Sequence, residues 1–411
     1  MFNKNSIVFN TAFRWSGEIL NKGLWFVFFV ILARILGNRD FGYFTYTFAF
    51  GSLAAIFTDL GTNIFLVKSI SKDKNTVSEL GSVIELKIFL SIIVLVISAV
   101  IAFFSAEKPW IVIVFTGSLL LSAFLDPAVS VFRAHKQMYY ETIIMLFWRI
   151  LIVGLSLLGI YLLHFGLIEI SISFIAGGFI ALVAAILVIK RVYNADFFLF
   201  RKPNIEFWKK ILKVSVPMGV LVIFAGIFFK LNVILLEHFK TSREVGWYSA
   251  AFKLIEGTFF VPSIFIGTLF PFLCETNEDS RISDSSHFLF KRAFIFLLSI
   301  SVLIAAVFTL FSDKIILILY GIQYLPAENS LKIISWALIF IFLNELFMFT
   351  FLSVEKQKTV FNFMLISLAI YLVLCLILIP AYGAIGSSWT LLLTQIVLFS
   401  LNFSAIRGLR K

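Results

Sequence analysis

The sequence predicts an all-α polytopic membrane protein with about twelve transmembrane helices in two six-helix lobes. Hydrophobic residues make up 61% of the 411 residues, charged residues make up only 14%, and the mean hydropathy is +1.02. Runs of roughly 20 apolar residues, the length that crosses a bilayer as a helix, recur along the whole chain. A short motif near the N-terminus also returns in the second half, which indicates an internal duplication.

Hydropathy windows of about 19 residues place the individual helices. The first lobe, 1–190, contains six predicted helices: 14–36, 42–66, 81–105, 110–132, 141–163 and 167–189. The second lobe, 212–411, contains the other six: 212–237, 245–271, 289–312, 330–352, 358–380 and 384–406. We place a basic linker at 191–211 between them. The break around it, Lys190 to Lys213, holds seven Lys or Arg against two acids.

Lysine and arginine between spans accumulate on the cytoplasmic side of membrane proteins. Here 22 of them fall on the side shared by the N-terminus and the linker, against seven on the other side. We therefore expect both termini to be cytoplasmic. The net charge of +11 then follows from topology and from anionic membrane lipids, so no nucleic-acid partner is needed to explain it.

The duplicated motif reads Arg39-Asp-Phe-Gly-Tyr-Phe-Thr-Tyr-Thr-Phe48 in the first half and Arg243-Glu-Val-Gly-Trp-Tyr-Ser-Ala-Ala-Phe252 in the second. Each copy precedes the second helix of its lobe. We predict a structural turn built from Arg39, Gly42, Arg243 and Gly246, in which glycine allows a tight bend. Because six helices separate the copies, the lobes are parallel repeats. This predicts a pseudo-two-fold axis along the membrane normal, with a substrate path between the lobes.

Two further pairs of similar segments, which we call echoes, occur in the two halves of the chain in the same order. Phe124-Leu125-Asp126 returns as Phe342-Leu343-Asn344, each followed by a Lys-Gln pair. The turn Phe165-Gly166-Leu167-Ile168 resembles Tyr382-Gly383-Ala384-Ile385. Three echoes in one order favour duplication over chance.

Ionisable side chains inside apolar helices mark candidate sites, because each costs at least about 2.5 kcal/mol unless it faces a partner or a watery cavity. Those near the inner interface can reach water, and the deeper ones favour function. Close to the interface lie Arg14, Asp59, Glu85 and Lys87. Deeper lie Lys22, Asp126, Arg149, Lys230, Lys253, Glu256 and Glu345.

Arg14, Glu18 and Lys22 recur every four residues and therefore form one polar stripe on the first helix. Glu18 can pair with either neighbour, which leaves one positive charge in surplus. If the lobes face each other, this stripe and the deep cations line one chamber that suits a phosphate-bearing headgroup. The predicted cationic cavity consists of Arg14, Lys22, Arg149, Lys230 and Lys253.

Patterns typical of enzymes are missing from the sequence. It contains no GxxxxGK[ST] loop, HExxH pair, GxSxG elbow or cysteine and histidine spacing for a metal. The aromatic residues Trp25, Phe28 and Phe29 favour packing or lipid contact over a sugar platform. We therefore expect a transporter that has neither a catalytic residue nor a resident metal or cofactor.

Leu32-Ala-Arg-Ile-Leu-Gly-Asn-Arg-Asp-Phe-Gly42, followed by Asp59-Leu-Gly61, resembles the opening of the bacterial polysaccharide repeat-unit flippases. These form the Wzx-type branch of the multidrug/oligosaccharidyl-lipid/polysaccharide exporter superfamily. Helix count, basic central linker and the repeated R-[DE]-x-G-[YW] turn agree with that family. The family positions transfer to Arg34 through Gly42 and to Asp59 through Gly61.

The resemblance implies that an undecaprenyl-diphosphate-linked oligosaccharide, such as an O-antigen or capsule unit, moves from the inner to the outer leaflet of the bacterial cytoplasmic membrane by alternating access. It implies coupling to a proton or sodium gradient, and membrane lipids, a polysaccharide polymerase and a chain-length regulator as partners. The carboxylates that could then bind the coupling ion are Glu18, Asp59, Glu256 and Glu345.

Three alternatives stay open. A multidrug efflux antiporter would share the fold. An oligosaccharide polymerase would also be polytopic, but it should carry a large external loop, whereas the longest loop here is internal. A passive structural or receptor protein fits poorly with charges at mid-membrane. Twelve helices instead of fourteen weigh against the lipid II flippase branch, and the first helix lacks the proline that a drug exporter would use to bend it.

Overall fold

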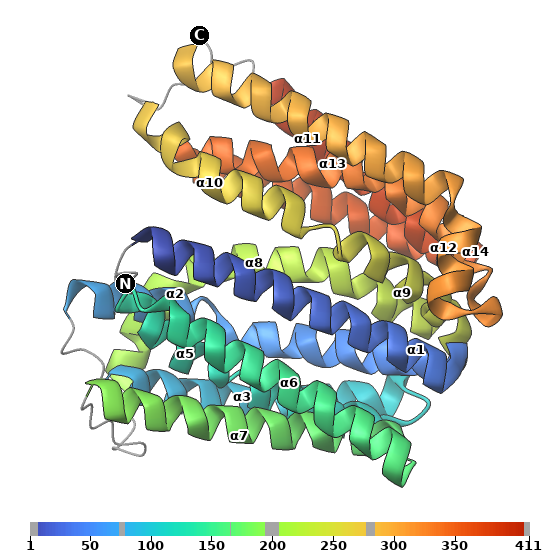
Figure 1. Ribbon diagram of the computed structural model, residues 1–411, viewed down its shortest axis with the longest axis horizontal. Coiled ribbons are helices and arrows are strands. Elements are labelled where there is room, and N and C mark those ends of the chain that lie inside the picture. The colour runs from blue at the N-terminus through green and yellow to red at the C-terminus, as the bar shows by residue number, and fades with distance from the viewer. Residues whose placement is uncertain (1–6, 74–78, 165, 194–204, 277–283, 407–411) are drawn as a thin grey trace. The chain divides into compact units, whose positions relative to one another are not determined.

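The computed structural model describes residues 7–73, 79–164, 166–193, 205–276 and 284–406, and within these ranges the regular structure is helical (Figure 1). The all-α class is therefore confirmed. The first part of the chain forms α1 (Ile7–Asp59), α2 (Thr62–Lys72), α3 (Glu79–Ser105), α4 (Pro109–Ser122), α5 (Leu125–Ala134), α6 (Met138–Leu163) and α7 (Leu167–Tyr193). The second part forms α8 (Ile205–Phe239), α9 (Ser242–Glu256), α10 (Phe260–Thr276), α11 (Asp284–Leu310), α12 (Ser312–Tyr320), η2 (Ile322–Tyr324), α13 (Ala327–Ser353) and α14 (Gln357–Ile406).

Each of the twelve predicted ranges overlaps one or two of these helices. Nine stretches of the described chain are long and apolar enough to cross a membrane. Two of them, α1 and α14, contain a bend, and each holds two predicted helices. The remaining predicted helix, 212–237, lies in α8, which is not among these nine stretches. The predicted linker falls mainly on residues 194–204, which lie outside the described residues.

The two bends fall at glycines whose backbone conformation other residues rarely adopt. Gly37 has φ 76° and ψ 172°, and it separates predicted helix 14–36 from predicted helix 42–66. Gly383 has φ 58° and ψ −129°, and it separates the last two predicted helices. The chain therefore reverses direction at these points with almost no loop.

The sequence predicts one continuous helix over 42–66, but the structure breaks this helix near its C-terminal end. Leu60 and Gly61 both have positive φ, 43° and 78°, so α1 stops at Asp59 and α2 restarts at Thr62. The Asp59-Leu-Gly61 motif is therefore the break itself.

Predicted helices 110–132 and 245–271 are also interrupted, α4 from α5 and α9 from α10. In both cases a proline, Pro127 or Pro262, is the third residue of the following helix. A proline lacks the backbone N–H and its ring clashes with the carbonyl four residues earlier, so the preceding turn cannot continue through it. The prolines were visible in the sequence, and the continuous helices predicted there are wrong.

α12 is a short helix that hydropathy windows cannot find, because nine residues are too few to span a bilayer. Its last carbonyls are bound by a residue from α1. Arg34 donates from Nε to the carbonyl of Leu319 at 2.7 Å and from Nη2 to the carbonyl of Ile318. A cation at a helix C-terminus satisfies open carbonyls and complements the helix dipole. This contact explains the arginine in the Leu32-to-Gly42 motif.

η2 then links both copies of the duplicated motif. The carbonyl of Gln323 accepts hydrogen bonds from Asn38 Nδ2 at 3.2 Å and from Trp247 Nε1 at 3.1 Å. The hydroxyl of Tyr324 donates to the carbonyl of Ala33 at 2.8 Å. Residues 312–324 thus hold the Gly37 bend against the start of α9.

By its internal contacts the chain divides into two compact units. The first consists of 1–28 and 47–231, and the second of 29–46 and 232–411. The contacts therefore group the Gly37 bend with the second half of the sequence and most of α8 with the first half. The division into lobes 1–190 and 212–411 stays a prediction.

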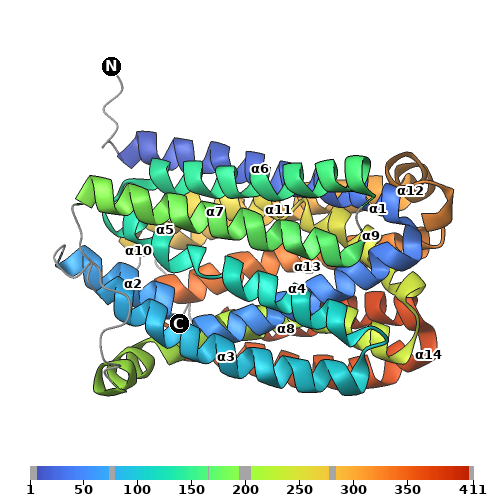
Figure 2. The same cartoon turned by 90° about the horizontal axis from the view of Figure 1, so that it is seen from below.

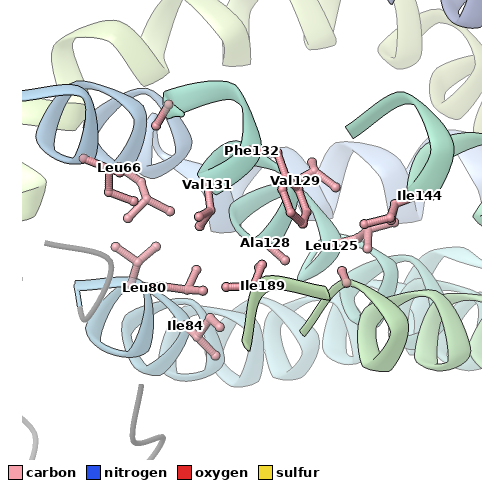
Figure 3. Close-up of a cluster of buried hydrophobic side chains, with 14 of the residues drawn as sticks. Leu66, Leu80, Ile84, Leu125, Ala128, Val129, Val131, Phe132, Ile144 and Ile189 are labelled. Atoms are coloured by element: carbon pink, nitrogen blue, oxygen red, sulfur yellow. The ribbon is translucent and has the colours of Figure 1, made fainter. Parts of the chain in front are cut away.

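Each unit has its own helix packing. In the first, α7 packs along α6 and α4, and Figure 2 shows α6 and α7 side by side. In the second, α13 packs against α14 and α11. A buried apolar cluster lies at one end of the first unit, where α2, α3, α5, α6, α7 and α8 meet (Figure 3). Leu66, Leu80, Leu125 and Ile189 belong to it, and each is at most 1% exposed.

Close backbone contacts at glycines hold the part of α1 that follows the Gly37 bend against α9. A Cβ atom on Gly42 would lie 1.7 Å from the carbonyl oxygen of Ser242, and one on Gly246 would lie 2.2 Å from that of Asn38. Asn38 and Gly42 have the same spacing as Ser242 and Gly246. The contact between the two segments is therefore reciprocal, because each glycine lies against the carbonyl that precedes the other glycine by four residues. Small residues allow such backbone approach between membrane helices.

The glycines therefore have a different role from the one we predicted. Gly42 lies inside α1 and Gly246 inside α9, and neither has a positive φ. The tight turn predicted at Gly42 is wrong, because the bend is at Gly37. Arg39 and Arg243 lie beside these glycines and are exposed.

Replacing Gly42 with alanine should lower the free energy of unfolding by about 2 kcal/mol, because the new methyl group would overlap backbone that cannot rotate away. The measurement is thermal or denaturant unfolding of the purified protein in detergent. Gly117→Ala is the matched control, since a Cβ there meets nothing within 4 Å and alanine is the better helix former. Equal stability of the two variants would contradict the packing role of Gly42.

Candidate functional site

The polar stripe on α1 begins the site. Lys22 Nζ lies 3.3 Å from Glu18 Oε1, and the two side chains are 38% and 57% exposed. Of the two partners predicted for Glu18, Lys22 is therefore the one it contacts. Arg14 lies one turn earlier and is exposed.

Arg149 of α6 joins this stripe through one hydrogen bond and one aromatic ring. Its Nε donates to Asn21 Oδ1 at 2.6 Å, and its guanidinium carbon lies 4.0 Å from the centre of the Trp25 ring. The Trp148 ring is 4.8 Å away on another side. Among the described residues the terminal nitrogens of Arg149 have no hydrogen-bond acceptor, so the planar donor group is held in place with its outer edge available.

An aromatic cluster connects Arg149 to a third predicted cation. Trp25 contacts Phe48, with ring centres 5.6 Å apart, and Lys230 Nζ lies 5.4 Å from the centre of the Phe48 ring. Phe115 and Phe174 complete the cluster. Cations over aromatic faces are stabilised where water is scarce. The first unit therefore places Arg149 and Lys230 on one aromatic cluster, and Lys22 follows Asn21, the residue that binds Arg149, in α1; we call Lys22, Arg149 and Lys230 the cation site.

The aromatic residues of the first helix can now be compared with the prediction. Phe28 and Phe29 are fully buried and Trp25 is partly buried, so they pack inside the protein, as expected for one of the two favoured alternatives. Asn21 was not predicted. Its position one residue before Lys22 would have placed it near the stripe, but only the fold shows that it orients Arg149.

The second unit holds the remaining predicted groups. Lys253 is 8% exposed, its Nζ contacts Glu256 Oε2, and it lies 4.0 Å from the centre of the Phe29 ring. Glu345 of α13 accepts a hydrogen bond from Ser263 at 3.3 Å. The single chamber formed from both lobes stays a prediction.

A second cluster of charges lies in the first unit, on α1, α3, α5 and α6. Lys87 is fully buried, and its Nζ lies 3.9 Å from Asp59 Oδ1. Asp59 Oδ1 also accepts a hydrogen bond from Thr62 at 3.1 Å. Asp126 of α5 interacts electrostatically with Lys87 and Asp59. Lys87 thus belongs to a buried network, and the expectation that it reaches the interface is wrong.

Arg133 and Glu141 complete this cluster as a two-bond ion pair. Arg133 donates from Nε to Glu141 Oε2 at 3.3 Å and from Nη2 to Oε1. Glu141 is 7% exposed. Neither residue is among the site residues predicted from the sequence, because both fall near predicted helix ends, where a charge is ordinarily solvated.

These features define the chain as a multi-pass helical membrane protein with ionisable groups held inside its helical units. The chain belongs to the polysaccharide biosynthesis protein family, whose model matches residues 7–277. No curated protein sequence matches it significantly.

Solved structures support the fold. The chain is similar to "Lipid II flippase MurJ, inward closed conformation", with a TM-score of 0.74 and 15% identity over 96% of this chain and 87% of the other. It is also similar to an inward-facing multidrug resistance MATE family transporter of the MOP superfamily, with a TM-score of 0.69 and 14% identity over 95% of both chains. The Vibrio cholerae MATE transporter VcmN in the bent form gives 0.54 and 16% over 98% of both.

Replacing Arg133 with glutamine should lower the free energy of unfolding by about 2 kcal/mol, because Glu141 would remain buried without its charged partner. Adding Glu141→Gln should recover part of the loss, since two amides can bond without a charge. Stability in detergent is the measurement. Lys332→Gln, which removes a partly exposed pair between neighbouring turns of α13, with Glu328 27% exposed against 9% for Glu141, should change stability by at most about 0.5 kcal/mol. Equal losses at the two sites would contradict the buried role of the Arg133 pair.

Proposed function

We propose that this protein is a flippase that moves an undecaprenyl-diphosphate-linked oligosaccharide from the cytoplasmic to the outer leaflet. It is a transporter and not an enzyme, and it acts in the bacterial cytoplasmic membrane with both termini in the cytoplasm. Membership of the polysaccharide biosynthesis family supports the substrate class. The observation that carries the proposal is Arg149, a preoriented guanidinium inside a helical unit of a membrane protein.

The cation site suits a pyrophosphate for two reasons. Arginine presents paired N–H donors in one plane, which matches two phosphate oxygens at once, and lysine adds charge without a fixed direction. Asn21 and Trp25 hold the Arg149 plane before any ligand arrives, so binding would cost little side-chain entropy. Lys22, paired with Glu18, and Lys230 over Phe48 would neutralise the remaining charge.

The mechanism follows from the chemistry of the substrate. A pyrophosphate and several sugars cannot cross hydrocarbon unaided, whereas a polyprenyl chain stays in lipid at no cost. The polar part would therefore enter the cavity of cations while the tail remains outside it. Rocking of the two lobes would then open the cavity to the other side of the membrane. A polymerase and a chain-length regulator would use the product.

Arg149→Gln and Lys230→Gln should each reduce surface polysaccharide at least about tenfold in a host that lacks its own flippase, because each removes a charge-assisted contact to phosphate. In spheroplasts, a larger fraction of the lipid-linked saccharide should resist added glycosidase. Arg149→Lys should remain defective, since it keeps the charge but loses the planar donor pair.

Lys314→Gln is the matched control, because Lys314 also lies over an aromatic ring, Phe311, but is exposed on α12. It should leave polymer unchanged. Normal polymer in both Arg149→Gln and Lys230→Gln, at normal protein levels, would refute the assignment of the cation site.

A multidrug transporter is the second candidate, and the similarity to MATE family transporters over nearly the whole chain favours it. Two measurements in the flippase-deficient host distinguish the two functions. Expression should restore polymer in the flippase-deficient host without raising resistance to cationic drugs. Raised resistance without restored polymer would establish the second candidate instead.

A further inference from the structure

Glu18 lies where α1 contacts α6 in the first unit. A Cβ atom on Gly17 would lie 2.0 Å from Cγ2 of Thr142, so the two helices touch one residue before Glu18. Three residues after Glu18, Asn21 Oδ1 accepts the hydrogen bond from Arg149 Nε at 2.6 Å. Glu18 therefore lies between two contacts of the same pair of helices, one turn from the residue that orients Arg149.

Helical spacing places Glu18 on the side of α1 that faces Arg149. Glu18 and Trp25 are seven residues apart, close to two full turns, and the Trp25 ring centre lies 4.0 Å from the guanidinium carbon of Arg149. Leu20 and Val27 follow these two residues by two positions, roughly 200° around the helix, and are 58% and 52% exposed. This apolar side of α1 suits lipid, so the exposed carboxylate of Glu18 lies on the opposite, polar side.

Lys22 differs from Arg149 in the group that holds it. Lys22 Nζ lies 3.3 Å from Glu18 Oε1, one turn away on the same helix. Arg149 is held by an amide oxygen and an aromatic ring, and neither of these cancels its charge. A carboxylate does cancel the charge of an ammonium. Lys22 therefore has to leave Glu18 before it can bind phosphate at full strength.

The pair of Glu18 and Lys22 is weak enough to open. Its side chains are 57% and 38% exposed, and a single contact between neighbouring turns is screened by water. The pair of Arg133 and Glu141 is of the opposite kind, because it joins α5 to α6 through two hydrogen bonds and the Glu141 side chain is 9% exposed. Lys22 can therefore change partners without loosening the helices.

An anion that several cations hold is difficult to release. In a medium of low dielectric constant the attraction between a diphosphate and the cation site is strong, and each cation left behind would lack a counter-charge. A carboxylate within reach of an ammonium lowers this cost, because the ammonium returns to it when the phosphate leaves. A site on a transport pathway has to release its ligand as well as bind it.

We propose that Glu18 competes with the substrate diphosphate for Lys22: it gives up the ammonium as the substrate binds and takes it back as the substrate leaves. Glu18 acts through Lys22, so it is a positioning residue, and its effect is to speed dissociation from the cation site. Its place in transport rests on the proposed function, whereas the exchange of partners is a property of binding alone.

The binding of farnesyl diphosphate to the full-length protein, in nanodiscs of uncharged phosphatidylcholine, tests the exchange. In Glu18→Gln the dissociation rate should fall at least about threefold, because the competitor for Lys22 is gone. This change should exceed the change in association rate, since a repelling charge slows approach whereas a competing partner assists departure. Glu18→Asp keeps a carboxylate and should restore most of the wild-type dissociation rate.

Infrared difference spectra recorded as farnesyl diphosphate binds follow the carboxylate itself. The carboxylate stretching bands of Glu18 should shift when its ammonium partner leaves. This signal should be lost in Glu18→Gln, which assigns it, and in Lys22→Gln, where there is no ammonium to give up. A signal that persists in Lys22→Gln would overturn the exchange.

The second unit offers a matched control. Glu328 and Lys332 on α13 form a pair with the same spacing in the sequence and the same distance of 3.3 Å. Glu328→Gln should leave both rates and the infrared signal unchanged. Farnesol, which has the same tail without phosphate, should bind the wild type and Glu18→Gln alike. An equal effect in Glu328→Gln, or an effect of Glu18→Gln on association alone, contradicts the proposal.

Polymer export in the flippase-deficient host tests the place of Glu18 in transport. Export should fall in Glu18→Gln although the diphosphate is held longer, and Glu18→Asp should recover it at equal protein level and thermal stability. If the wild type exports no polymer but Glu18→Gln slows dissociation, the proposed function fails and the exchange stands. If the wild type exports polymer and Glu18→Gln changes neither export nor dissociation, the exchange fails and the function stands.

Discussion

Close approach of helices at glycine residues positions the other parts of this structure. The segment from Asn38 to Gly61 meets a different helix at each of three glycines. Gly42 contacts the start of α9, Gly51 contacts α4 at Thr116, and Gly61 contacts α8 at Ser215. Inside a membrane, helices gain little from hydrophobic association, so close van der Waals packing at small residues has to supply the stability. Any larger side chain at these positions would separate helices that carry the charged groups.

These contacts give the repeated motif a structural role, although Phe48, at the end of its first copy, also lies in the cation site. The two copies pack on each other, and η2 binds both through one carbonyl. Glu244 of the second copy accepts a hydrogen bond from the backbone N–H of Ala384 at 3.0 Å, beside the Gly383 bend. The motif thus holds the Gly37 and Gly383 bends within the second unit, and the cations that suit transport, Lys22, Arg149 and Lys230, lie on α1, α6 and α8.

The two charged clusters differ in how their buried cations are stabilised in a medium of low dielectric constant. Arg149 and Lys230 lie over aromatic rings, whereas Lys87 is offset by carboxylates alone. Cations over rings retain their capacity to bind an anion, while a lysine beside a carboxylate is already engaged. Glu18 acts electrostatically on a cation of each group, Arg133 and Arg149.

Hydropathy and helical spacing are local properties, so the sequence was enough to predict the helical class, the approximate positions of the helices and most of the charged residues in the two clusters, but not the breaks within 42–66, 110–132 and 245–271. It placed Arg14, Glu18 and Lys22 on one stripe and marked Arg149 and Lys230 by depth. Tertiary contacts were needed to show which groups meet: Asn21 with Arg149, Lys87 with Asp59, Arg133 with Glu141, and Arg34 with the end of α12. The structure also replaced the predicted turn at Gly42 with a bend at Gly37 and a backbone contact. Such pairings depend on how distant helices approach one another, and that approach is set by packing between surfaces that no single window of sequence contains.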